Sequence, residues 1–486
     1  MIILWLLLAV FLLLLALRLW GNYKFPSPEN GTSTETRSPF VESTFQTLGS
    51  PRQALAERIG IICNATRCID LQYYAHADDR SGRLILAHLL QAAGRGVRVR
   101  ILLDDIDLGT RSALFARLVL EYDKLEIRIF NPLALRRWQW CEFLARFPRA
   151  NRRMHNKSLS VDRSISILGG RNIGDEYFSR GDEVWFLDHD VLVRGDIADQ
   201  VAVQFDHFWK SALSVEIHRV DKPARQGTFA RWHDSLWATL RDTEVDSPPA
   251  DPAPALAPAQ GRIIHDAPEK VVKPLFEFID NGVATQLSTI LEGARNDVLF
   301  TSPYLVPGEQ GMHIIESLRK RGIQVTVLTN SFASNDVWLV NSGYRDYRER
   351  MLAIGVSIFE LKPSSPSGEL VPDQSHPISL HAKAFVIDHQ QVFLGSLNFD
   401  SRSALHNTEM GVIFNDPDGG ERVTTWIRDH ARLAAYELSL GDDKTLRWRE
   451  QRLRQPDIYH DIDPGVSRLS RMGSYVCSWL PLEWML

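Results

Sequence analysis

The sequence predicts an α/β protein made of two tandem copies of one domain, preceded by a membrane helix. Strand-like and helix-like segments alternate in the same order in both halves of the 486-residue chain. One polar motif begins at His155 and again at His381, and a Pro/Ala-rich stretch separates the two copies. Alternating strands and helices are typical of layered α/β domains, and this length suits two of them.

The N-terminus predicts an uncleaved membrane anchor over residues 1–20. Residues 1–17 are an unbroken apolar run, with Arg18 and Lys24 after it and no basic residue before it. A secretory signal peptide would carry a basic start and a small-residue cleavage site, and neither is evident. The basic flank favours a cytoplasmic position for the rest of the chain. Residues 21–43 are polar and predict a tether.

The two predicted domains cover residues 44–245 and 263–440. In the first, we expect helix, strand, helix and strand at residues 52–65, 68–74, 84–93 and 97–103. In the second, the same order recurs at residues 287–294, 298–304, 313–321 and 323–328. Residues 246–262 form the Pro/Ala linker, and residues 441–486 are a C-terminal extension. The duplication therefore extends over whole domains.

The repeated motif is H-x-K-x4-D, which is unlikely to arise twice by chance in a chain with only 15 histidines. Its members are His155, Lys157 and Asp162 in the first copy and His381, Lys383 and Asp388 in the second. Two further pairs keep the same spacing from the histidines: Asn172 with Asn398, and Glu183 with Glu409. A single histidine is more often structural than catalytic, but a repeated set of polar residues predicts a catalytic site.

The residues after each lysine predict a strand, a short turn and a second strand. At strand spacing, the histidine and the lysine project from the same face. A lysine cation, amide groups and small residues that allow close backbone approach are suited to holding phosphoryl oxygens. The sequence thus predicts a phosphoryl site with an imidazole placed to attack phosphorus.

These motifs resemble the phospholipase D superfamily, whose pattern is H-x-K-x4-D followed by G-[SG]-x-N. The resemblance implies two phospholipase D-type α/β/α sandwich domains related by a pseudo-twofold axis. It also implies phosphodiester exchange without a metal or other cofactor, in which one histidine forms a phosphohistidine and the other acts as general acid and base.

Carried over to this chain, the resemblance makes His155 the nucleophile and His381 the acid and base. Lys157, Lys383, Asn172 and Asn398 would bind phosphoryl oxygens. Asp162 and Asp388 would fix the architecture, and Glu183 and Glu409 would orient the histidines. Gly170 stands where the second copy has Ser396, so a hydroxyl contact to substrate is expected from one half only.

From about Phe45 to Leu486 the chain also resembles bacterial cardiolipin synthases, particularly the C type, through segments such as residues 69–74 and 169–178. That subgroup implies transfer of a phosphatidyl group onto phosphatidylglycerol, with phosphatidylethanolamine or a second phosphatidylglycerol as donor. It implies a place at the bacterial inner membrane, and family precedent allows an accessory protein that no residue here identifies.

Two segments leave the substrate open. Residues 136–153 interleave arginines with aromatic residues, which suits a nucleic-acid groove, an interfacial lipid patch or a solvated basic face. Residues 479–486 carry two tryptophans and could be a domain strap or an interfacial contact. The net charge of −5 argues against a nucleic-acid partner. The rival functions are a phospholipase D hydrolase, a membrane-tethered nuclease and a catalytically silent scaffold.

The cysteines predict neither a metal site nor a disulfide framework. Cys63, Cys68, Cys141 and Cys477 lack the spacing of zinc ligands, and they are too few for a disulfide scaffold in a chain of this length. We expect a reducing compartment.

Overall fold

The computed structural model describes residues 12–20, 37–180, 184–242, 257–273, 282–335, 337–364, 376–441, 443, 445–452 and 455–479. Five sequence expectations lie wholly or partly outside these residues: residues 1–11 of the anchor, most of the tether, Glu183, residues 246–256 of the linker, and residues 480–486 of the tryptophan-bearing C-terminal segment. Residues 12–20 are helical, as the anchor requires. Among the described residues, no helix is long and apolar enough to cross a bilayer.

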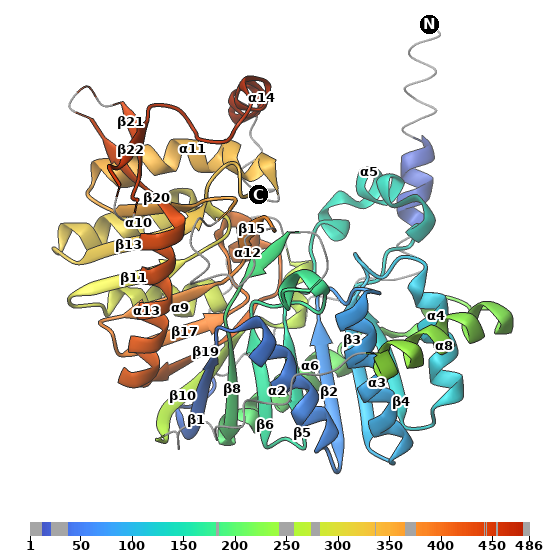
Figure 1. The fold of residues 1–486 in the computed structure, drawn as a ribbon. Helices are drawn as coiled ribbons and strands as arrows, with labels where there is room; N and C mark the ends of the chain where they lie inside the picture. Colours follow the sequence, from blue (N-terminus) through green and yellow to red (C-terminus); the bar gives the residue numbers. More distant parts are fainter. Residues whose placement is uncertain are drawn as a thin grey trace, which may run out of the picture.

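One continuous mixed sheet runs through both halves (Figure 1). From its outer edge inwards, the first half contributes β9 (Ser214–Glu216), β4 (Leu125–Phe130), β3 (Arg98–Asp104), β2 (Cys68–Tyr73), β5 (Ser158–Val161), β6 (Ile165–Gly169), β8 (Asp190–Gly195) and β1 (Val41–Leu48). The second half continues outwards with β10 (Ala259–His265), β19 (Met410–Asn415), β17 (Gln391–Gly395), β16 (Ala384–Ile387), β11 (Asp297–Thr301), β13 (Gln324–Asn330), β14 (Ser357–Leu361), β20 (Ala435–Leu440), β21 (Leu446–Glu450) and β22 (Ile458–His460). The strand order of one half mirrors that of the other, which confirms the predicted duplication.

The halves join where β1 and β10 pair antiparallel, with Val41 opposite Gly261 and Ser43 opposite Ala259. β1 also pairs with β8, so a strand at the start of the chain lies between the two halves. Both strands begin inside segments that we expected to be irregular, the tether and the linker. Local composition predicted loop there, but pairing within the sheet decides the conformation.

Helices cover the sheet in both halves (Figure 1). They are α2 (Pro51–Cys63), α3 (Arg80–Gly94), α4 (Arg111–Glu121), α5 (Gln139–Ala150), α6 (Asp196–Lys210), α7 (Ile217–Val220), α8 (Gln226–Asp242), α9 (Val283–Glu292), α10 (Gly308–Lys320), α11 (Trp338–Ala353), α12 (Ser401–Leu405), α13 (Pro417–Ala434) and α14 (Arg468–Ser478). The four helices predicted from the sequence are confirmed as α2, α3, α9 and α10, with boundaries shifted by a few residues. Ser50 caps α2 and Pro51 occupies its first turn, which explains why the helix begins there.

Four buried apolar clusters hold the described part of this fold together. One lies within each half, and a third joins the halves through residues of β1, β8, β10, β17, β19, α6 and α13. A fourth, smaller cluster lies in the first half and includes Val271 of the second. In the third cluster the rings of Phe45 and Phe414 stack with their centroids 4.5 Å apart. The contact between the halves is therefore a hydrophobic core in its own right, which fixes their relative position.

A buried charge cluster at the junction should be essential for stability. Asp190 is fully buried and pairs with Arg58 at 2.8 Å and Arg171 at 3.1 Å, both also buried. Asp190→Ala leaves two guanidinium groups without their counter-charge, so we expect the free energy of unfolding to fall by about 3–5 kcal/mol. Asp199→Ala, which removes an exposed partner of Arg163, should cost less than about 1 kcal/mol. Urea unfolding of both variants tests this, and equal losses would contradict it.

Candidate active site

The two H-x-K triplets lie together at the junction of the halves, each immediately before a strand. β5 begins at Ser158 and β16 at Ala384, so the expectation that histidine and lysine share one strand needs correction. β2 pairs with β5 only as far as Ser158. The residues before each strand are held instead by the other half of the chain.

Backbone hydrogen bonds fix each triplet to the opposite half. The amide of His155 donates to the carbonyl of Thr408 at 2.9 Å, and the amide of His381 donates to the carbonyl of Leu187 at 2.7 Å. Next to the second contact, β7 (Trp185–Leu187) pairs in parallel with β15 (Ile378–Leu380). Each histidine backbone is thus fixed by the opposite half.

The imidazole rings are held in the same crossed manner. Nδ1 of His155 lies 3.0 and 3.1 Å from the carboxylate oxygens of Glu409, and Nδ1 of His381 lies 2.6 Å from Oδ2 of Asp188. A carboxylate at Nδ1 fixes the tautomer and leaves Nε2 free for chemistry. Neither half can supply a complete histidine–carboxylate pair alone.

Glu409 therefore lies where we predicted, but the first half supplies Asp188 where the sequence suggested Glu183. In the first half Gly169 pairs with Asp190, 21 positions later, whereas in the second Gly395 pairs with Gly411, 16 positions later. Asp188 and Glu409 each stand two residues before the paired position. The first half thus carries five extra residues, and the equal spacing of Glu183 and Glu409 ignores them. Aligning the strands, instead of counting from the histidine, points to Asp188.

The difference between Gly170 and Ser396 follows from these two carboxylates. A Cβ atom on Gly170 would lie 2.2 Å from Oδ1 of Asp188, so only glycine leaves room for that carboxylate. The hydroxyl of Ser396 donates to Glu409 and accepts from the amide of Met410 at 3.0 Å. The serine therefore positions Glu409, and its hydroxyl is already engaged before any substrate contact.

Both lysines are buried beside their histidines. The ammonium of Lys157 donates to the carbonyl of His155 at 2.8 Å, and Lys383 donates to the carbonyl of His381 in the same way. The charge of each lysine lowers the pKa of both imidazoles, in addition to the lowering that burial causes. The two ammonium groups therefore lie near both imidazoles, where they could stabilise a bound phosphoryl anion.

The two motif asparagines retain unused hydrogen-bonding capacity. Nδ2 of Asn172 donates to the hydroxyl of Tyr177 at 2.9 Å. The Oδ1 atoms of Asn172 and Asn398 are buried and have no hydrogen-bond partner among the described residues. Since an asparagine amide can rotate to exchange its oxygen and nitrogen, and a tyrosine hydroxyl both donates and accepts, either amide can present a donor to a ligand.

Asp162 and Asp388 follow the C-terminal ends of β5 and β16, away from the histidines, and their contacts are structural. Asp162 and Asp388 begin tight turns, with φ of 53° and 52°, a conformation that aspartate tolerates. Asp162 accepts from the amides of residues 66–68 at 2.8 to 2.9 Å, and Asp388 accepts from the amides of residues 295–297 at 2.7 to 3.1 Å. Each aspartate ties its turn to the start of the neighbouring strand, β2 or β11.

The two histidine–carboxylate pairs differ in charge. Burial, followed by the lysine charges, lowers the pKa of His155 well below its ordinary value and that of His381 to about 4. Burial raises the pKa of Glu409 to about 7. Burial opposes ionisation of Asp188 as well, but the charges of His381 and Lys383 outweigh it and hold its pKa below the ordinary value. At neutral pH, Asp188 is therefore a carboxylate, while Glu409 is near its titration point.

Aromatic rings that the sequence motifs do not reveal enclose the imidazoles. Tyr74 meets His155 edge-on with ring centroids 5.1 Å apart, and Tyr177 meets His381 in the same way at 5.1 Å. Phe186 lies 5.3 Å from His381. Tyr74 and Tyr177 belong to the segments 69–74 and 169–178 that carry the family resemblance. That resemblance was the one feature of the sequence that could have pointed to these two rings.

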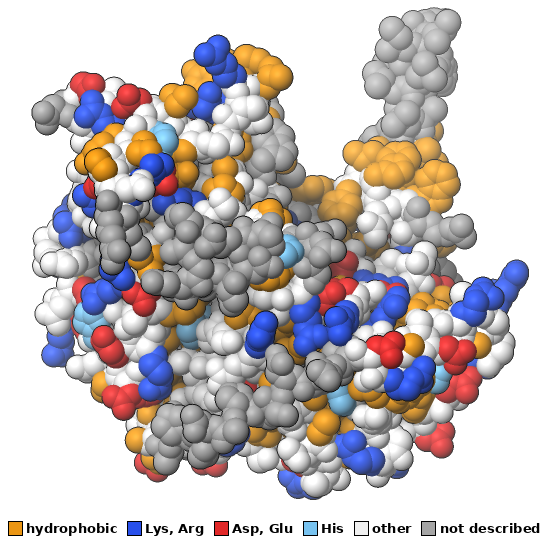
Figure 2. Space-filling view, in the orientation of Figure 1, with side chains coloured by type: hydrophobic (Ala, Val, Ile, Leu, Met, Phe, Trp, Pro, Cys, Tyr) orange, Lys and Arg blue, Asp and Glu red, His pale blue; other side chains and the backbone are white. Residues whose placement is uncertain are grey.

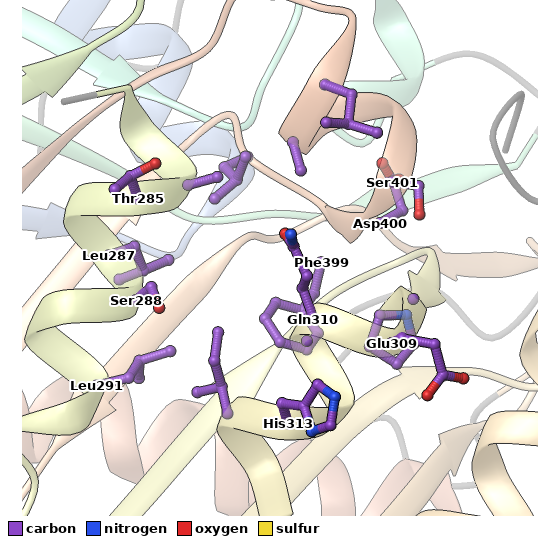
Figure 3. Close-up of a pocket in the computed structure, with 18 of the residues that line it drawn as sticks. Thr285, Leu287, Ser288, Leu291, Glu309, Gln310, His313, Phe399, Asp400 and Ser401 are labelled. Carbon is purple, nitrogen blue, oxygen red and sulfur yellow. The ribbon is translucent and has the colours of Figure 1, made fainter. Parts of the chain in front are cut away.

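A cavity of about 630 Å³ opens beside the site, between α9, α10 and α12 (Figure 3). Asn398 lines it together with Phe399 and Asp400, so the cavity reaches the motif of the second half. Its walls also include apolar side chains of α9 and α10, such as Leu287, Leu291 and Ile314. The volume is in the range of small-molecule sites.

Metal ligands do not gather in the described part of the chain. Within it, no three His, Cys, Asp or Glu side chains form a group that could hold a metal ion. The four cysteines are all free thiols.

Comparison with known proteins identifies the family. The family model described as "Cardiolipin synthase, PLD-like domain" matches residues 59–209 and 287–431, one block in each half. The chain belongs to this family. Cardiolipin synthase C of Escherichia coli strain K12 is 34% identical over 448 residues, which cover 89% of this chain and 94% of that protein. An uncharacterised protein of Helicobacter pylori is 32% identical over 394 residues, which cover 78% and 77% of the two chains.

A solved structure supports the fold. The crystal structure of phosphatidylserine synthase from Haemophilus influenzae Rd KW20 matches with a TM-score of 0.59 at 15% sequence identity, covering 82% of this chain and 89% of that one. At this level of identity the match shows a shared fold and leaves the substrate to be argued from the site.

The structural part of the motif aspartates can be separated from catalysis. Asp162→Ala removes acceptors from several backbone amides, so we expect the free energy of unfolding to fall by about 1–3 kcal/mol. Turnover per folded molecule should stay unchanged. Lys157→Ala should instead lower turnover by roughly 100-fold or more, because it removes a cation at the phosphoryl position. Denaturation curves and turnover of both variants test this, and inactive but fully stable Asp162→Ala would refute the structural role.

The titration of Glu409 should control the rate. Its protonated form would donate to Nδ1 of His155 and move the ring proton to Nε2, which blocks attack. We therefore expect turnover to rise with pH and level off above about pH 7. The pKa of Glu409 is higher in the folded protein than in the unfolded chain, so its protonation stabilises the fold. The free energy of unfolding therefore falls as pH rises from the ordinary pKa of glutamate to about 7. A gain in stability cannot explain the rise in turnover.

Glu409→Gln is the matched variant, because its amide oxygen still accepts from Nδ1 but carries no charge. Turnover should fall by roughly 10²–10⁴-fold, and the dependence on pH near 7 should disappear. Single-turnover rates between about pH 5 and about pH 9 measure this. A variant that keeps the same rise would assign it to another group.

Proposed function

We propose that the protein is a phosphatidyltransferase that makes cardiolipin from phosphatidylglycerol and a donor phospholipid through a phosphatidyl-histidine intermediate. The observation that carries the proposal is the crossed pairing of two histidines with two carboxylates, beside two buried lysines. This arrangement offers one nucleophile, one proton carrier and a cationic place for the phosphoryl oxygens.

In the first step, Nε2 of His155 attacks the donor phosphorus, and the bond from phosphorus to the headgroup oxygen breaks. His381 gives its Nε2 proton to that oxygen, which releases ethanolamine or glycerol. This step requires His381 in its charged form, which burial and the lysine charges disfavour in the free protein. The Asp188 carboxylate at 2.6 Å favours that form, and the phosphate anion of a bound donor offsets the lysine charges that oppose it. Glu409 balances the positive charge that forms on His155.

In the second step, a glycerol hydroxyl of phosphatidylglycerol gives its proton to His381 and attacks phosphorus. The phosphorus–nitrogen bond breaks, and cardiolipin leaves with His155 restored. Lys157, Lys383, Asn172 and Asn398 hold the phosphoryl oxygens through both steps. Water in place of the glycerol hydroxyl would yield phosphatidic acid, so transfer depends on a site that excludes water.

Three features favour lipid over nucleic acid. Three of the arginines of residues 136–153 that would line a nucleic-acid groove are engaged inwards: Arg136 with Asp105, Arg146 with Glu142 and Arg153 with Asp104. The cavity at Asn398 has apolar walls that fit hydrocarbon. The relative of highest identity described above is a cardiolipin synthase.

We further propose that residues 1–20 anchor the chain in the bacterial inner membrane by a single span, with the body on the cytoplasmic side. The helix at residues 12–20 exposes Leu12, Leu13, Leu15 and Leu19, in keeping with this proposal. The substrates are then lipids of the same membrane.

The test is lipid analysis of cells that lack endogenous cardiolipin synthesis and express this chain. We expect cardiolipin with the unaltered chain and none with His155→Ala or His381→Ala. His218→Ala, which removes an exposed histidine, is the matched control and should leave cardiolipin unchanged. Phosphatidic acid alone would indicate hydrolysis, and cleavage of oligonucleotides without lipid change would indicate a nuclease.

A lipid phosphodiester with a nitrophenyl leaving group separates the roles of the histidines, because nitrophenolate leaves without protonation. With this substrate, His381→Ala should release nitrophenolate in a burst and accumulate a phosphatidyl group on His155. His155→Ala should form no adduct. An adduct on His381 in the latter variant would reverse the assignment.

A further inference from the structure

α14 is an amphipathic helix whose apolar face points to solvent, the reverse of the usual arrangement in a soluble protein. Leu469, Met472, Val476 and Trp479 follow helical spacing along one stripe, and this stripe faces solvent, with Leu469 76% and Trp479 73% exposed. The buried residue of the helix is Ser474, whose hydroxyl reaches Asn341 of α11 at 3.4 Å. The polar face is thus packed inwards and the apolar face is presented outwards.

α5, in the other half, has the same inversion. Glu142 and Arg146 are buried and form an ion pair of 2.7 Å on the inner side of the helix. Trp140 and Leu144, one turn apart, are 62% and 63% exposed, and Trp138 precedes them with similar exposure. Two helices from different halves therefore share an arrangement that water disfavours.

Both stripes lie on one side of the molecule. Figure 1 shows α5 and α14 at the top of the view, together with the helix at residues 12–20. In Figure 2, hydrophobic side chains gather at two projecting points on that side, over these same elements. Helix 12–20 lies close to α5, since the charge of Arg18 adds to the effect of burial in lowering the pKa of Arg146.

The occupant of these surfaces must be apolar, extended and able to reach both halves at once. A bilayer surface meets these conditions, because the helix at residues 12–20, which lies close to α5, belongs to the N-terminal segment whose residues 1–17 are an apolar run in the sequence. Trp140 of α5, Trp138 just before it and Trp479 just after α14 suit the headgroup depth, where tryptophan is enriched. Arg468, exposed at the start of α14, suits anionic lipid phosphates.

We infer that α5 and α14 are two interfacial helices that rest both halves of the protein on a lipid bilayer. Trp138, Trp140 and Leu144 enter from the first half, and Leu469, Met472, Val476 and Trp479 from the second. α5 ends at Ala150, five residues before His155, so the first contact lies next to the catalytic segment. The inference rests on the proposed function for its choice of lipid as occupant.

Dye attached at single positions of the full chain tests this contact directly. The four native cysteines are replaced by serine, and Leu144→Cys, Met472→Cys and Leu120→Cys are each labelled with an environment-sensitive dye. Leu120, on α4, is 62% exposed and serves as the matched control away from both helices. The chains are reconstituted into vesicles of phosphatidylglycerol and phosphatidylethanolamine, with brominated acyl chains as quencher.

We expect a blue shift and quenching at positions 144 and 472 and neither at position 120. Dyes at 144 and 472 that stay in water on vesicle-bound chains would overturn the inference, as would burial of only one of the two. A blue shift without lipid that grows with protein concentration, together with a doubled mass, would show that a second copy covers these helices and would also overturn it.

Turnover on vesicles supplies an independent readout. Trp140→Asp with Leu144→Asp, and separately Met472→Asp with Val476→Asp, should each lower turnover on vesicles by about tenfold or more. Leu120→Asp should leave it unchanged, and circular dichroism checks that each variant is folded. The labelling result should persist in a His155→Ala chain, so a failure of docking can be distinguished from a failure of the proposed chemistry.

Discussion

The imidazole of each motif histidine is held by a carboxylate from the opposite half. Glu409 holds His155, and Asp188 holds His381. This exchange requires the two triplets to meet, and the rest of the fold meets that requirement: β1 and β10 join the sheets, and a buried core fixes the halves against each other. The position of the site at the junction is thus a consequence of chemistry that neither half completes.

The strand order of the first half recurs in the second, which adds β21 and β22 at its outer edge, but the environments of the two imidazoles differ. Gly170 makes room for an ionised aspartate, while Ser396 supports a glutamate that titrates near neutrality. Two copies of one motif thereby acquire different proton affinities, which a reaction with one nucleophile and one acid requires.

Much of the site was predictable because its parts are local in sequence. The residues after each lysine predicted a strand, a short turn and a second strand, and the structure has them, with the turns at Asp162 and Asp388. Asp188 was missed because five inserted residues break the count between the halves. The crossing of the carboxylates was also beyond prediction, because a periodic pattern describes one strand and says nothing of contacts between residues some 200 positions apart. The sequence of α5 does not show that its charged residues are buried and its apolar residues exposed, so this feature could be recognised only in the structure.

The crossed carboxylates also set the order in which function appears during synthesis. A ribosome that has released the first half has delivered His155 and Lys157, but the partner of His155 lies near the end of the chain. Until Glu409 emerges and β10 closes onto β1, the nascent protein contains a histidine without the group that fixes its tautomer. Under the proposed function, the protein therefore cannot act on lipids until its second half has folded onto its first.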